Sequence, residues 1–101
     1  MVQKLARRTF SPEDLRAMAT GLIEDGLADQ YHDYAGAEQA TMAIASLLNF
    51  LAKRGEVDAR KANASLDRLF ATVRDDEKFR PGDFRSALGD LREVVTARTT
   101  P

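Results

Sequence analysis

Cysteine and tryptophan are absent from this chain of 101 residues, and His32 is its one histidine. The lack of cysteine excludes disulfides, thiolate nucleophiles and cysteine-ligated zinc or iron–sulfur clusters. A single imidazole excludes any site that takes two histidines from one chain. We therefore expect no metal and no cofactor.

Long apolar runs are also missing. The longest stretch without a charged residue is Gln39–Ala52, shorter than the ~18 apolar residues that a membrane-spanning helix needs. Residues 1–10 are basic, but Ser-Pro-Glu-Asp follows where the apolar core of a signal peptide would stand. We expect a cytoplasmic protein that does not contact a membrane. The excess of arginine over lysine and the abundant alanine are typical of a bacterial chain.

What the sequence does contain is typical of one small globular domain. Hydrophobic residues make up 44% of the chain and charged residues 31%, with a formal net charge of −1. Apolar residues recur at helical spacing in four segments, and no segment alternates at the period of a strand. We predict an all-α fold, a compact antiparallel four-helix bundle over residues 11–98. A basic N-terminal arm (1–10) precedes it and a frayed tail (99–101) follows.

The first and fourth predicted helices begin with the same pattern. In residues 10–16, Ser11 is a good N-cap and the proline after it suits the first helical position. Residues 79–85 repeat the pattern, but Arg80 stands at the cap without a capping oxygen. We predict that Gly26 ends the first helix in the left-handed conformation.

The second predicted helix, from Tyr34 or Gly36 to Arg54, is apolar over a wide arc. Ala43 and Phe50 flank one side of its stripe and small alanines flank the other. The arc spans roughly 200°, where a surface helix shows about 100°. It indicates self-association or a partner; alternatively, the small alanines are buried inside the monomer.

Asp58 is the predicted N-cap of the third helix, after a very short turn. A short connection makes consecutive helices antiparallel neighbours, so the second and third helices should form a hairpin.

Residues 31–34, Tyr-His-Asp-Tyr, form the one cluster that has the composition of a site. His32 beside a carboxylate has the groups of an acid–base pair, but no nucleophile accompanies it. The alternative is that both tyrosines pack on the end of the bundle. Because aromatic residues and methionine are enriched at interfaces, we take four residues as candidate partner contacts. They are Tyr31, Tyr34, Met42 and Phe50.

Asp25, Asp29 and Asp33 recur every four residues, which on one helix would align three carboxylates for a metal. Glycines interrupt this region, so we expect a solvated acidic connector instead. No catalytic constellation is evident, and we expect that the protein is not an enzyme.

A basic group surrounds the predicted turn between the second and third helices. Arg60 and Lys61 stand in the first turn of a helix, where the dipole disfavours cations by ~0.3–1 kcal/mol. A nucleic-acid phosphate would favour them there, whereas the alternative is local pairing with Glu56 and Asp58. The sequence pI of 5.8 argues against a dedicated nucleic-acid binder.

We therefore expect a non-enzymatic interaction module: a regulatory, adaptor or accessory subunit that binds itself, as a homodimer, or another protein. The alternative is a nucleic-acid-binding regulator that uses the N-terminal arm and the hairpin of the second and third helices. Its contact residues would be Lys53, Arg54, Arg60 and Lys61.

Overall fold

Four α-helices and one short 3-10 helix account for most of residues 11–97, the part of the chain that the computed structural model describes. They are α2 (Pro12–Leu27), α3 (Tyr34–Lys53), α4 (Ala59–Thr72), η1 (Asp76–Lys78) and α5 (Pro81–Thr96). No strand occurs within these residues. The predicted all-α four-helix bundle is confirmed, and the predicted arm (1–10) and tail (99–101) lie outside the described range.

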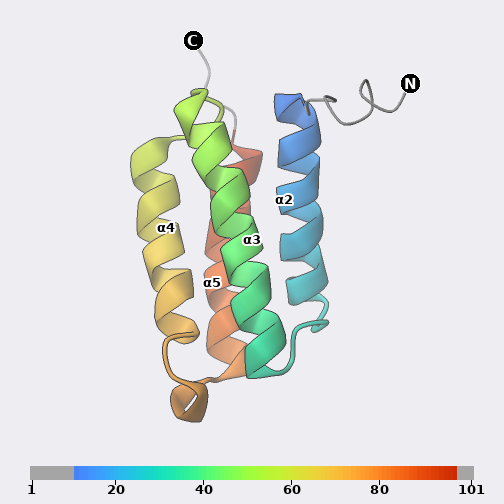
Figure 1. Ribbon diagram of the computed structural model, residues 1–101, viewed down its shortest axis with the longest axis vertical. Helices are drawn as coiled ribbons and strands as arrows, with labels where there is room; N and C mark the ends of the chain where they lie inside the picture. Colours follow the sequence, from blue (N-terminus) through green and yellow to red (C-terminus); the bar gives the residue numbers. More distant parts are fainter. Residues whose placement is uncertain (1–10, 98–101) are drawn as a thin grey trace, which may run out of the picture.

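Each helix packs between two neighbours around the core. α2 and α4 both pack against α3 and α5, and α3 and α4 approach each other less closely than the other three pairs. Figure 1 shows α3 in front, α5 behind, and α2 and α4 on either side. The connection between α3 and α4 is short and the two helices run antiparallel, as the hairpin prediction requires. One face of each helix is thus left for solvent.

The core is a single cluster of mostly aliphatic side chains with one fully buried aromatic ring, that of Phe84. The predicted apolar stripes supply most of it, although two of their residues, Met18 and Phe70, are 45% and 40% exposed. The buried members are Leu15, Ala19, Ile23, Ala37, Ile44, Leu48, Leu51, Val57, Ala62, Leu66, Leu69, Val73, Phe84, Ala87, Leu88, Leu91 and Val95.

Short polar side chains cap three of the four α-helices. The Ser11 hydroxyl accepts from the backbone N–H of Asp14, whose carboxylate accepts from the N–H of Ser11, both at 3.1 Å. Asp33 caps α3 and Asp58 caps α4 in the same way. Arg80, at the N-cap of α5, makes no side-chain cap hydrogen bond. The shared entry pattern therefore gives the same backbone start but only one capping box.

The prediction that Gly26 ends α2 is wrong. The helix continues to Leu27, and the left-handed residue is Asp29, with φ of 67°. A Cβ atom at position 26 would collide with Cδ1 of Leu88, a fully buried residue of α5. This glycine therefore lets α2 and α5 approach each other, and it does not form a turn.

Two glycine-to-alanine variants test this packing. Gly89 lies within α5, and a Cβ there has no atom within 4 Å. Gly89→Ala should raise the free energy of unfolding by up to ~1 kcal/mol, because alanine favours a helix over glycine. Gly26→Ala should lower it, because Leu88 has no room to move. Urea denaturation measures both, and a gain in stability for Gly26→Ala would contradict the close approach.

A second pair of variants tests the caps. Ser11→Ala removes a hydroxyl that accepts from a free backbone N–H and should cost ~0.5–2 kcal/mol. Arg80→Ser supplies such a hydroxyl to α5 and should stabilise the protein slightly. The denaturation midpoints should therefore move in opposite directions. A rise for the first variant with a fall for the second would show that capping does not control these two helix starts.

Candidate interaction surface

The side of α3 that faces away from the core carries two charges, those of Glu38 in its second turn and of Lys53 at its end. We call seven of its exposed residues the α3 face: Gln39, Met42, Ala43, Ser46, Asn49, Phe50 and Lys53. Their spacing of three and four residues aligns them along the helix. Met42 is 60% exposed and Phe50 is 53% exposed, while the only charge on the α3 face is that of Lys53.

The two flanks of the apolar arc of α3 have different environments. Ala45 and Ala52 are half-buried and pack against the core. Ala43 and Phe50, on the other flank, are exposed. The alternative that the small alanines of the arc lie inside the monomer thus holds in part for one flank, where they are half-buried. The other flank presents apolar side chains to solvent.

The remaining large apolar side chains on the surface lie beside the α3 face. Glu24 of α2 and Arg68 of α4 pair with α5, so the opposite edges of α2 and α4 turn toward α3. Met18 lies on that edge of α2 and Phe70 on that edge of α4; they are 45% and 40% exposed. All four exposed large hydrophobic residues of the described chain therefore gather around one helix.

Ion pairs cover the opposite side of the bundle. Three of them join α5 to its neighbours: Glu24–Arg92 at 3.4 Å, Asp29–Arg85 at 2.8 Å and Arg68–Asp90 at 3.6 Å. Within residues 11–97, no ion pair includes a residue of α3. The bundle thus has its inter-helix ion pairs around α5, whereas the side around α3 has none within residues 11–97.

A hollow of about 180 Å³ lies on the α3 face, lined by Ser46, Asn49, Phe50 and Lys53. These residues stand at i, i+3, i+4 and i+7, the four positions that receive one side chain from a facing helix in knobs-into-holes packing. The guanidinium of Arg54 lies over the Phe50 ring, 5.4 Å from its centroid. Phe50 was predicted from the sequence as a partner contact, whereas the hollow beside it was not predicted.

Tyr31 and Tyr34 lie apart from this hollow, at the other end of α3. Both pack against the core, and the Tyr34 hydroxyl donates to the carbonyl of Val73 at 2.9 Å. Burial raises the pKa of Tyr31, and the carboxylate of Asp25 adds to this effect. Sixteen residues of helix, about 24 Å, separate Tyr34 from Phe50. The four predicted contact residues therefore do not form one site.

The acidic residues of the α2–α3 connection have separate structural tasks. Asp33 caps α3, and Asp29 pairs with Arg85 of α5. His32 is exposed beside them. The part of the chain that the structure describes holds no group of three His, Cys, Asp or Glu residues able to bind a metal ion.

The basic group gathers where α3 ends and α4 begins. Glu56 pairs with Arg16, and Asp58 accepts from the backbone N–H of Lys61, so neither carboxylate pairs with the cations nearby. Four exposed cations form no ion pair inside the 11–97 range: Lys53, Arg54, Arg60 and Lys61.

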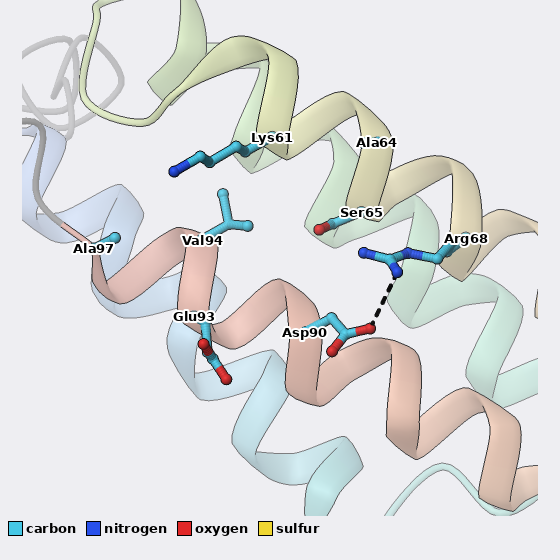
Figure 2. Close-up of a pocket in the computed structure, with 8 residues that line it drawn as sticks. All are labelled: Lys61, Ala64, Ser65, Arg68, Asp90, Glu93, Val94 and Ala97. Carbon is cyan, nitrogen blue, oxygen red and sulfur yellow. Dashed lines mark ion pairs between the residues drawn. The ribbon is translucent and has the colours of Figure 1, made fainter.

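A second hollow, of about 400 Å³, lies between α4 and α5 and has walls of opposite charge. Figure 2 shows Lys61 and Arg68 on the α4 wall, Asp90 and Glu93 on the α5 wall, and the Ser65 hydroxyl directed into the space between them. The Arg68–Asp90 pair crosses the hollow. Because cations and carboxylates balance here, the hollow favours neither an anion nor a cation.

Comparison with protein-family models, curated proteins and solved structures finds no match for this chain. In residues 11–97, each helix is too short or too polar to cross a membrane.

Proposed function

We propose that this protein is a small, non-enzymatic interaction module that binds a protein partner through the α3 face. A second copy of the chain is the first candidate partner, and a regulatory, adaptor or accessory subunit is the role that fits such a module. The cysteine-free composition, rich in arginine and alanine, is in keeping with a bacterial cytoplasmic protein.

One observation carries this proposal: every exposed large hydrophobic side chain of the described residues lies on or beside a single helix face whose one charge is that of Lys53. Exposed apolar residues scattered singly need no explanation, but a contiguous group marks an interaction site. Methionine and aromatic residues are enriched at interface cores, and charged residues are depleted there. Full burial of a methionine or phenylalanine side chain contributes ~1.5–3 kcal/mol, so Met42 and Phe50 are the expected anchors.

Site-specific photo-crosslinking tests the α3 face without assuming which protein binds it. A benzophenone amino acid replaces Asn49 on the α3 face, or Ser86 on the exposed side of α5 as the matched control. Illumination of cells should give a discrete higher-mass adduct from position 49 and none from position 86. Adducts of equal yield from both positions, or none from position 49, would contradict the proposal.

Nucleic-acid binding at the α3–α4 turn is the second candidate function. The observation that favours it is the group of four exposed cations that form no ion pair within the described residues. Two of them, Arg60 and Lys61, lie in the first turn of α4, where a bound phosphate would also meet the positive end of the helix dipole.

Arg60→Gln/Lys61→Gln tests this candidate. If the turn binds phosphates, the double variant should weaken binding equally for all sequences and lower the salt dependence by about two phosphate contacts. Fluorescence anisotropy with labelled DNA and RNA measures both quantities. Arg74→Gln/Lys78→Gln, at the other end of α4, removes the same charge and is the control. A wild-type protein that binds neither probe at physiological salt would rule the candidate out.

A further inference from the structure

We infer that the α3 face binds the α3 face of a second copy in antiparallel orientation, with Met42 of each copy inserted into the hollow of the other. This inference rests on the proposed function and specifies its partner. It follows from three properties of the α3 face: the position of its hollow, the placement of its one charge, and its area.

The hollow and the protruding side chain lie at equal distances from Ser46. In an antiparallel pair with its two-fold axis at Ser46, residue 46+n of one copy faces residue 46−n of the other. The hollow is centred between Asn49 and Phe50, so it faces the region of Met42 and Ala43. Met42, at 60%, is the most exposed of the four large hydrophobic residues on the surface, and its flexible side chain suits an irregular hollow. Its sulfur would meet the Phe50 ring of the other copy.

Charge selects the antiparallel orientation. Lys53 of one copy faces the uncharged Gln39 of the other, seven residues from Ser46 on the opposite side. The two lysines are then fourteen residues of helix apart, about 21 Å, which is beyond the Debye length of ~8 Å at physiological salt. A parallel pair would bring the two Lys53 ammonium groups together. The net charge of −1 on each chain adds little repulsion.

The area of the α3 face shows whether the neighbouring helices also contribute to the dimer interface. A helix face about 30 Å long and 10 Å wide covers roughly 300 Å², whereas a standard interface buries about 800 Å² on each partner. The edges of α2 and α4 must therefore contribute. A two-fold axis crossing α3 at Ser46 keeps α2 beside α2 and α4 beside α4, which brings Met18 and Phe70 to the border of the contact.

A charge-swap series measured by sedimentation equilibrium tests the pairing. Met42→Lys places a second cation beside Lys53 of the other copy and should weaken the dimer at least about tenfold. Adding Lys53→Glu should restore much of the affinity, because the new lysine then lies about 4.5 Å along the helix axis from a glutamate of the other copy. Within one chain these positions are eleven residues apart, about 17 Å, too far to pair. Ser86→Lys, on the exposed side of α5, is the charge control, and thermal melting checks that each variant stays folded.

Cysteine crosslinking tests the register, because the natural chain has no cysteine. Ser46→Cys places two thiols at the axis, within the 4.4–6.8 Å Cα separation of a disulfide, so mild oxidation should give a covalent dimer. Met42→Cys alone should not crosslink, since its copies lie about 12 Å apart along the axis, whereas a mixture of Met42→Cys and Phe50→Cys chains should.

The outcomes separate this inference from the proposed function. A dimer that Met42→Lys weakens, Lys53→Glu rescues and Ser46→Cys traps supports the inference. A monomeric wild-type protein at every concentration overturns it, and so does a dimer without rescue or crosslink. The photo-adduct at position 49 decides the proposed function separately: an adduct with a different protein keeps that function and removes the second copy as its partner.

Discussion

The guanidinium of Arg16 joins three parts of the bundle that are far apart in the sequence. The Arg16 residue is 9% exposed. Its guanidinium donates to the carbonyl of Val95 in α5 and to that of Glu56, whose carboxylate lies 3.6 Å away. The Val95 carbonyl is among the last four of α5, which lack helical partners and carry the negative end of the dipole. These contacts offset the cost of burying a cation. Because Glu56 belongs to the turn that ends α3, Arg16 also ties the orientation of α3 to that of α2 and α5.

Arg85 occupies the same place in the entry of α5 that Arg16 occupies in the entry of α2. Since α2 and α5 are antiparallel, each arginine reaches the far end of the other helix: Arg16 meets Val95, and Arg85 meets Asp29. The repeated entry pattern thus has a physical consequence beyond capping, because it closes both ends of one helix pair with charge. The charged contacts gather around α5, and no ion pair within residues 11–97 involves α3.

The sequence predicted the helices, two of the caps and most of the core, because these depend on local spacing and capping chemistry. Its failures involve contacts between helices. Glycine is common at helix ends, yet the role of Gly26 depends on Leu88, sixty-two residues away. Arginine is expected on the surface, and Arg16 is buried only because backbone carbonyls at two helix ends accept hydrogen bonds from its guanidinium. At the candidate site, exposed Met42 and Phe50 were found, but the hollow depends on how their neighbours stand on the folded helix.

The rotation of α3 about its axis is the feature that the sequence left open, since both flanks of its arc are apolar. Full burial of a phenylalanine contributes ~1.5–3 kcal/mol, more than burial of an alanine of much smaller area. Packing of the monomer alone would therefore favour burying the flank that holds Phe50. The structure instead half-buries Ala45 and Ala52 and leaves Phe50 in solvent. The bundle thus leaves the larger apolar side chain of that flank, Phe50, exposed to solvent. Contact with another protein surface would gain the free energy of burying it.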